Sequence, residues 1–162
     1  MKDNKMLFII FMIGTFTVGM AEYVVTGLLT QIADDMKVSI SSAGLLISVY
    51  AISVALIGPL MRIITLKVHA HRLLPIFVAI FIISNIVGML APNFNVLLLS
   101  RLMSAAMHAP FFGVCMSVAA TVAPPAKKTQ AIALVQAGLT IAVMLGVPFG
   151  SFLGGFANWR VV

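Results

Sequence analysis

The stretch GLTIAVMLGVPFGSFLGG, from Gly138 to Gly155, carries a small residue at every fourth position. Four residues advance about 400° around an α-helix, so these positions form one slowly wrapping, nearly bare seam. In water each glycine would weaken the helix by about 1 kcal/mol relative to alanine. In a bilayer the same seam lets two helices approach backbone to backbone, which favours a transmembrane packing helix. The seam consists of Gly138, Ala142, Gly146, Gly150 and Gly154, with Pro148 set among them.

The opposite side of this helix is polar. Gln136 and Thr140 each lie about 200° from Gly138, at the helical period of 3.6 residues per turn. Polar groups inside a membrane need a partner or a cavity. We therefore predict that both side chains line a transport pathway.

The composition places the chain in lipid. Of its 162 residues, 62% are hydrophobic and only 9% are charged, whereas soluble domains have about 25% charged residues. The net charge of +6 would suggest nucleic acid in a soluble protein, but these charges lie mostly in short connections. We expect the lipid bilayer, and no nucleic acid, as a partner. The single cysteine, Cys115, lies in an apolar run and is interpreted as a packing residue.

Hydropathy, together with the polar residues and prolines between apolar segments, predicts five helices. Each is long enough to cross a hydrocarbon core of about 30 Å. The connections between them are short and polar. The chain is thus predicted to be an all-α membrane protein. The expected spans are 6–29, 41–62, 73–91, 95–122 and 130–156.

Basic residues predict the orientation, because cytoplasmic loops carry an excess of lysine and arginine. Seven of the ten basic residues fall on one side of the predicted spans. Lys37 and Arg160 fall on the other side, and Arg101 lies within a helix. We expect a multi-pass protein of the cell (plasma or inner) membrane with a cytoplasmic N-terminus. The residues on the cytoplasmic side are Lys2, Lys5, Arg62, Lys67, Arg72, Lys127 and Lys128.

The last residues have the composition expected where a further membrane span begins. Asn158-Trp159-Arg160 is typical of a membrane interface, and Val161-Val162 starts an apolar run. We therefore expect residues 1–162 to be the first part of a longer transporter, whose C-terminal half is a missing partner.

Glu22 is the only acidic residue inside a predicted span. Thr15, Gly19, Glu22 and Thr26 recur at helical spacing, so they are expected to share one face. Carboxyl groups inside membranes mark ion pathways and proton relays, which makes Glu22 a candidate proton carrier. The alternative is a structural carboxyl group held by a neighbour. Thr26 is a candidate to line the same cavity.

Arg101 and His108 lie seven residues apart in the fourth span, on nearly the same azimuth and about 10 Å apart along the axis. Histidine titrates near neutral pH, so His108 can hand on protons or bind substrate. Arg101 is a candidate cavity residue, with snorkelling toward the interface as the alternative. Pro110 should bend this helix nearby. Tyr50 in the second span is a further cavity candidate, with helix-to-helix hydrogen bonding as the alternative.

Other classes of site lack their signatures in this sequence. There is no phosphate loop of the G-x-x-x-x-G-K-[ST] type, so no ATP site is expected. His69 and His71 are spaced as in a solvated linker rather than a metal site. We expect no metal, no cofactor and no enzymatic activity. An ion gradient would supply the energy for uphill transport, and Glu22 with His108 favours protons.

Several stretches together resemble the twelve-helix drug–proton antiporter branch of the major facilitator superfamily. The first, fourth and fifth helices carry GTFTVGMAEYVVTGLLTQIA (14–33), RLMSAAMHAPFFG (101–113) and the glycine-rich stretch quoted above. GPLMRIITLKVHAHRLL (58–74) occupies the place of the cytoplasmic gating motif, with Gly58, Arg62 and Arg72 as its candidate residues. The resemblance implies that the five helices form most of the N-terminal six-helix bundle of a major facilitator fold. It also implies functional roles for Arg101 and His108.

The leading hypothesis is therefore proton-coupled efflux, by antiport and alternating access, of small organic molecules or drugs. A second reading is proton-coupled or facilitated uptake of a metabolite such as a sugar or nucleobase. The third is a non-transporting membrane fragment that acts by helix association. The fifth-helix motif resembles that of antiporters and favours the first reading over the second.

Overall fold

Five long helices account for most of the chain in the computed structural model, which describes the backbone of residues 2–162 and the side chains from Lys5 onward. Met1 and the side chain of Lys2, part of the predicted basic N-terminus, lie outside this description. Within the described range there is no β-strand. The elements are α1 (Lys2–Met36), α2 (Ile40–Ala43), α3 (Leu45–Ile64), α4 (Ala70–Met89), α5 (Phe94–Val122), η1 (Pro125–Lys127), α6 (Lys128–Gly154) and η2 (Trp159–Val161).

Five helices are long and apolar enough to cross a bilayer, which confirms the predicted all-α membrane architecture. The first is longer than the predicted 6–29, because no helix-breaking residue intervenes before Lys37, where φ is +54°. The second span, predicted as one helix over 41–62, divides at Gly44 into α2 and α3. The ends of the other three helices differ from prediction by at most three residues, as expected for frayed helix ends.

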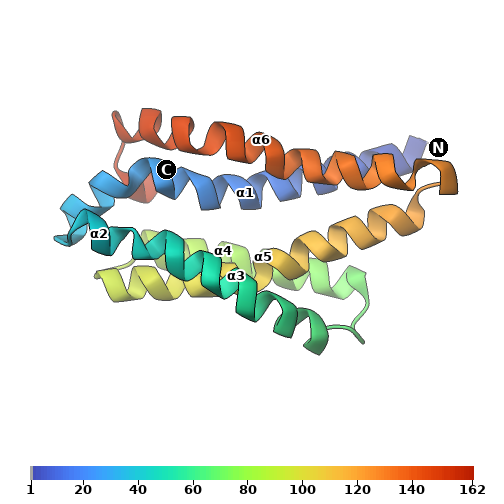
Figure 1. Cartoon of the computed structure of the whole chain (residues 1–162), viewed down its shortest axis with the longest axis horizontal. Coiled ribbons are helices and arrows are strands. Elements are labelled where there is room, and N and C mark those ends of the chain that lie inside the picture. The colour runs from blue at the N-terminus through green and yellow to red at the C-terminus, as the bar shows by residue number, and fades with distance from the viewer. Residues whose placement is uncertain (1) are drawn as a thin grey trace.

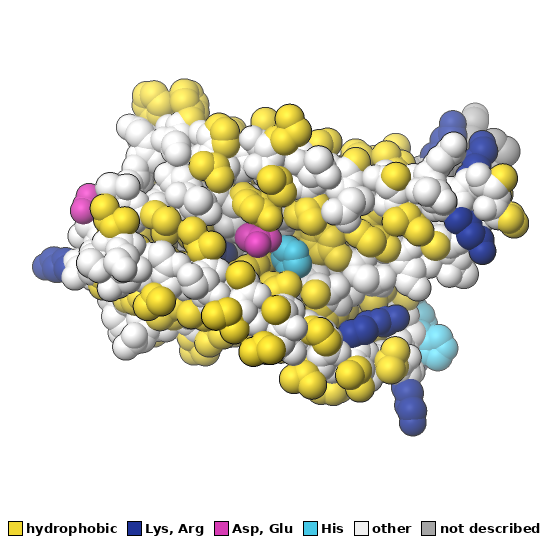
Figure 2. Space-filling model, in the orientation of Figure 1, with side chains coloured by type: hydrophobic (Ala, Val, Ile, Leu, Met, Phe, Trp, Pro, Cys, Tyr) yellow, Lys and Arg dark blue, Asp and Glu magenta, His cyan; other side chains and the backbone are white. Residues whose placement is uncertain are grey.

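The helices run back and forth along the long axis (Figure 1). The N-terminus, the α3–α4 connection and the α5–α6 connection lie at one end, and the α1–α2 connection lies with the C-terminus at the other. Lysine and arginine side chains gather at the end that holds the N-terminus (Figure 2). The basic connections thus share one end of the bundle, as their positions in the sequence predict.

Two groups of helices make up the bundle (Figure 1). α1 packs chiefly on α6, while α5 packs on α3 and α4 and also contacts both members of the first pair. Large apolar side chains remain exposed around the outside, among them Ile52, Leu56, Ile83 and Met144. Such a surface is stable in lipid, where apolar side chains need no burial against protein.

The small-residue seam of α6 forms the interface with α1. Its five residues, Gly138, Ala142, Gly146, Gly150 and Gly154, are all buried. Small residues of α1 lie opposite, since a Cβ atom added to Gly19 would come within 2.8 Å of Ala142 Cβ. A Cβ atom on Gly27 would lie 2.6 Å from the backbone nitrogen of Ser151. The two backbones therefore touch, and dispersion and weak Cα–H···O contacts can hold them together without a hydrophobic driving force.

Thr15 belongs to this interface. Its hydroxyl group donates to the carbonyl of Val135 on α6 at 2.7 Å, and the residue is fully buried. The side of α1 predicted to carry Thr15, Gly19, Glu22 and Thr26 therefore meets two different sets of neighbours. The seam of α6 covers Thr15 and Gly19, whereas Glu22 and Thr26 turn toward α3 and α5.

We expect Gly150→Ala to lower the melting temperature of the purified protein in detergent. The added methyl group would overlap the backbone of Val24, and overpacking typically costs about 1–3 kcal/mol. This cost outweighs alanine's advantage in helix propensity of about 1 kcal/mol. Gly113→Ala is the matched control, because no atom lies within 4 Å of its added Cβ. A Gly150→Ala protein as stable as that control would disprove the close backbone contact.

Candidate functional site

Glu22 of α1 meets the fourth membrane span inside the bundle. Its Oε2 atom lies 3.6 Å from Nδ1 of His108, which α5 supplies. The carboxyl side chain keeps 25% of its exposure, while the histidine side chain keeps 11%. Figure 2 shows an acidic and a histidine side chain next to each other near the middle of the molecule. An ionisable pair thus lies between two helices in the middle of the bundle.

His108 is held on several sides. The hydroxyl group of Tyr50, from α3, lies 2.8 Å from Nδ1, and the two rings meet edge to face at 5.8 Å. On its other side the imidazole stacks on Phe112, with 4.7 Å between ring centroids and an angle of 14°. The ring plane and the direction of Nδ1 are therefore fixed by contacts from two helices.

Arg101 connects α5 to both α1 and α3. Its two Nη atoms donate to the backbone carbonyl of Ala21 at 3.2 and 3.1 Å. Its guanidinium carbon lies 5.6 Å from the centroid of the Tyr50 ring, within the range of a cation–π contact. The residue is 8% exposed, so the alternative that it snorkels to the interface does not apply. The charge is satisfied inside the bundle, one residue away from Glu22.

A small cavity of about 50 Å³ opens beside this cluster. Glu22, Thr26, Tyr50 and Arg101 all line it. A water molecule needs about 10–15 Å³ of such space and two or more polar partners, so the cavity is large and polar enough for water. The predicted residues Glu22, His108, Arg101, Tyr50 and Thr26 are thus brought together, although His108 lies behind Tyr50 and Glu22 and does not line the cavity.

Gln136 and Thr140 do not line the small cavity beside Glu22, and their place on a transport pathway stays a prediction. Thr140 is exposed, and its hydroxyl group bonds to the Gln136 carbonyl of its own helix at 3.3 Å. The reason is the seam. Because α6 turns its small residues toward α1, the opposite face points away from the Glu22 cluster.

The predicted gating residues are spread along α3 and the start of α4. Gly58 is buried, and a Cβ atom there would lie 2.8 Å from Ala109 Cβ, so α3 and α5 approach closely beside Pro110. Arg62 is half-buried and Arg72 is exposed, and neither forms an ion pair within the part of the chain that the structure describes. These residues lie in the half of the bundle remote from Asp35 and Arg160.

A second, larger cavity of about 1000 Å³ lies among α1, α4, α5 and α6. Most of its lining is apolar, including Phe16, Phe81 and Phe149, and Pro148 of the α6 seam helix also borders it. Arg101 and Asn85 are polar members of the lining. Val161 and Val162 line the cavity too, next to Trp159. Its character is that of a groove suited to an apolar occupant.

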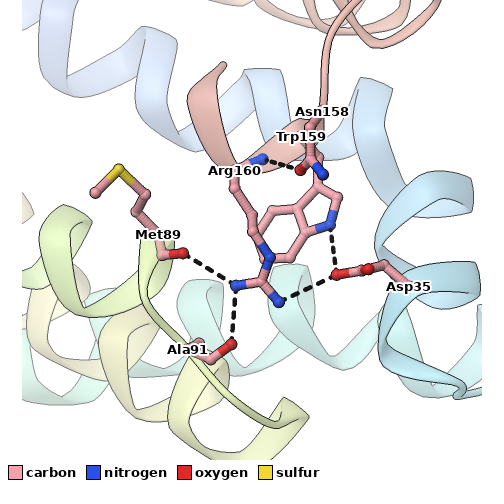
Figure 3. A network of polar contacts seen from close by, with 6 residues as sticks. All are labelled: Asp35, Met89, Ala91, Asn158, Trp159 and Arg160. Atoms are coloured by element: carbon pink, nitrogen blue, oxygen red, sulfur yellow. Dashed lines mark hydrogen bonds and ion pairs between the residues drawn. The ribbon is translucent and has the colours of Figure 1, made fainter.

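A polar clamp that the sequence did not predict lies at the C-terminal ends of α1 and α4 (Figure 3). Oδ2 of Asp35 accepts hydrogen bonds from Nε1 of Trp159 at 3.0 Å and from Arg160 at 3.1 Å. The other terminal nitrogen of Arg160 donates to the carbonyls of Met89 and Ala91 at 3.0 and 2.8 Å. The Arg160 guanidinium also lies 4.5 Å from the Trp159 ring centroid. The clamp thereby ties η2 to two helices at once.

One signal in the sequence could have found the clamp. Asp35 and Arg160 are opposite charges on the same predicted side, in a chain with four acidic residues. Arg160 also binds the last carbonyl groups around the end of α4, where a cation is favoured by the helix dipole. Spacing alone could not reveal the pair, because 125 residues separate the two side chains.

Polar groups are well accommodated throughout. Among the described residues, no buried side-chain nitrogen or oxygen lacks a hydrogen-bond partner. Within the same residues no group of three His, Cys, Asp or Glu side chains is placed to hold a metal ion. The ionisable cluster around Glu22 and the outer clamp are therefore the two polar centres of the bundle.

The structure is a helical membrane bundle that holds an acidic, a histidine and an arginine side chain between its helices. Comparison with known proteins is specific. A sequence model described as the Major Facilitator Superfamily matches residues 11–162. The chain belongs to the major facilitator superfamily, and its five spans are part of a major facilitator bundle.

Curated relatives cover nearly the whole chain. It is 50% identical over 163 residues to the "Uncharacterized MFS-type transporter YfhI" of Bacillus subtilis, covering 99% of this chain and 41% of the relative. It is 41% identical over 150 residues to the "Inner membrane transport protein YdhP" of Escherichia coli, covering 92% and 38%. A "Probable sugar efflux transporter" of Helicobacter pylori is 36% identical over 159 residues, covering 98% and 41%. The chain thus spans about two fifths of the length of these relatives.

We expect Asp35→Asn to destabilise the outer end of the bundle. The amide carries no charge to pair with Arg160. It also replaces one carboxylate oxygen of the residue that accepts from both Trp159 and Arg160. The loss should be about 1 kcal/mol, because the pair is partly exposed. Thermal unfolding of the purified protein measures the effect. Asp34→Asn is the control, since the Asp34 side chain is exposed and lies outside the clamp. Equal melting temperatures for the two variants would show that the clamp contributes nothing to stability.

Proposed function

We propose that this chain forms most of the N-terminal bundle of a proton-coupled efflux transporter that exchanges small organic molecules for protons. One observation carries the proposal: Glu22, an acid inside a membrane span, lies beside His108, Tyr50 and Arg101 at a small cavity. Ionisable groups in such positions are the usual carriers of protons through membrane transporters.

The cluster suits reversible protonation. The Glu22 side chain lines the cavity, while the Arg101 guanidinium donates to the backbone carbonyl of the adjacent residue, Ala21. When Glu22 releases its proton, the guanidinium is near enough for its charge to act on the carboxylate. When Glu22 takes up a proton, Arg101 remains satisfied by the backbone carbonyl. Both protonation states therefore have partners within the bundle.

Two further observations support efflux. The close α1–α6 seam is built from the motif that resembles the fifth helix of antiporters in this superfamily. One relative is named a probable sugar efflux transporter. Sugar efflux is accordingly the second candidate function, and it differs from drug efflux in substrate alone. Proton-coupled uptake of a metabolite remains the alternative in transport direction.

The setting proposed for this activity follows from the charges and the relatives. The end that carries the basic connections faces the cytoplasm, together with the N-terminus. The name of the YdhP relative supports the inner membrane of a bacterium. Further helices of the same transporter would cover the apolar cavity and face the Glu22 cavity, and the two halves would rock around that site.

The test uses the full-length transporter reconstituted in liposomes, with substrate chosen by screening for proton flux. Glu22→Gln should abolish transport driven by a pH gradient, because the amide cannot carry a proton. Substrate exchange without net proton movement should survive, since that process needs only the conformational change. Asp34→Asn, an acid-to-amide change outside the site, is the control. Gradient-driven efflux at the wild-type rate in the Glu22→Gln protein would overturn the proposal.

A further inference from the structure

Tyr50 stands out among the residues around Glu22 because it contacts the groups that the proton-coupling proposal depends on. Its hydroxyl group lies 2.8 Å from Nδ1 of His108, the same atom that Oε2 of Glu22 approaches at 3.6 Å. Its ring also lies under the Arg101 guanidinium. Two possible partners therefore converge on a single nitrogen atom.

Hydrogen-bond chemistry constrains how this nitrogen can serve both partners. A neutral imidazole carries one proton, on either Nδ1 or Nε2, whereas a tyrosine hydroxyl group can both donate and accept. When Nδ1 is unprotonated, Tyr50 donates to it, and the ring proton lies on Nε2. When Nδ1 is protonated, the Tyr50 oxygen accepts from it. The same 2.8 Å contact thus persists in both states.

We propose that Tyr50 is the positioning residue that keeps Nδ1 of His108 directed toward Glu22 while a proton moves between them; this rests on the proposed proton coupling. In the transfer, the O–H bond of Glu22 breaks and an N–H bond forms at Nδ1. Because Nδ1 has a single lone pair, the Tyr50 O–H turns away from it as the Glu22 proton arrives, keeps its own proton, and the Tyr50 oxygen then accepts from the new N–H. Glu22 is left as a carboxylate and His108 as an imidazolium, so charge and atoms balance.

The surroundings restrict the relay to these groups. α5 is packed against α1, α3, α4 and α6. From α1 the ionisable group facing His108 is Glu22, and Tyr23 of the same helix lines the neighbouring cavity. From α3 it is Tyr50, and Arg101 comes from α5 itself. The ionisable residues of α4 and α6 are His71, Arg72 and Lys128, which lie in the first turn of their helices. Phe112 covers a face of the imidazole and offers it no proton.

A ring flip of His108 would exchange the positions of Nδ1 and Cδ2 and so move the accepting nitrogen away from Glu22. Stacking on Phe112 fixes the ring plane but does not distinguish the two flipped orientations. The hydrogen bond to Tyr50 does distinguish them. Removing the hydroxyl group alone should therefore loosen the direction of Nδ1 while leaving the packing of the ring in place.

The test compares the full-length transporter with its Tyr50→Phe variant. With ¹⁵N-labelled histidine and a His108→Gln sample to assign the signal, wild-type His108 should show unprotonated Nδ1 and protonated Nε2 in its neutral form. Tyr50→Phe should yield a mixture of the two tautomers. It should also slow pH-gradient-driven transport roughly fivefold, as expected for the loss of one hydrogen bond, while substrate exchange is retained.

Ser53→Ala is the matched control, because it removes a buried hydroxyl group one turn along α3 that bonds only to the Val49 carbonyl. It should leave the His108 signal unchanged. An unchanged His108 tautomer in Tyr50→Phe would overturn the inference, whatever the transport rate. If instead Glu22→Gln keeps its coupled transport while the tautomer result holds, the proton-coupling proposal fails and the positioning contact stands as a structural one.

Discussion

Backbone contact between α1 and α6 is the constraint on which the rest of the bundle depends. In lipid, apolar side chains gain little by exchanging lipid tails for protein neighbours, so helices associate through close packing and hydrogen bonds. The seam from Gly138 to Gly154 brings the two backbones together, and Thr15 adds a hydrogen bond to Val135 across the interface. With α6 fixed on one side of α1, the other side is free to present Glu22 to α3 and α5.

This division of α1 explains how polar chemistry is tolerated in the membrane interior. Each member of the cluster has a partner from another helix: His108 for Glu22, Tyr50 for His108 and the Ala21 carbonyl for Arg101. A buried polar group without a partner would be costly in this setting. The cluster therefore also holds α1, α3 and α5 in register. A change in its protonation would alter contacts that join these three helices.

The sequence was sufficient for the span count and for much of the cluster. Hydropathy identified five spans, and the rarity of ionisable residues in them directed attention to Glu22, Arg101 and His108. Helical periodicity placed Arg101 and His108 on one face but could not say which neighbour each face would meet. That choice depends on packing among all the helices, which is why the sequence could not show that Thr15 meets α6 or that Gln136 lies apart from the Glu22 cluster. The contact of Asp35 with Arg160 depends on the complete fold for the same reason.

The α1–α6 interface also sets an order of events during synthesis. The Thr15 hydroxyl group and its partner carbonyl are 120 residues apart in the chain. At about 5–20 residues per second, ribosomes need about 6–24 s to make that intervening length. For this interval α1 resides in the membrane with its glycines and its threonine facing lipid or the insertion machinery. α1 thus meets its principal neighbour only after the three spans between α1 and α6 have been made, and until then its glycines and threonine lie on a surface that the α1–α6 interface later conceals.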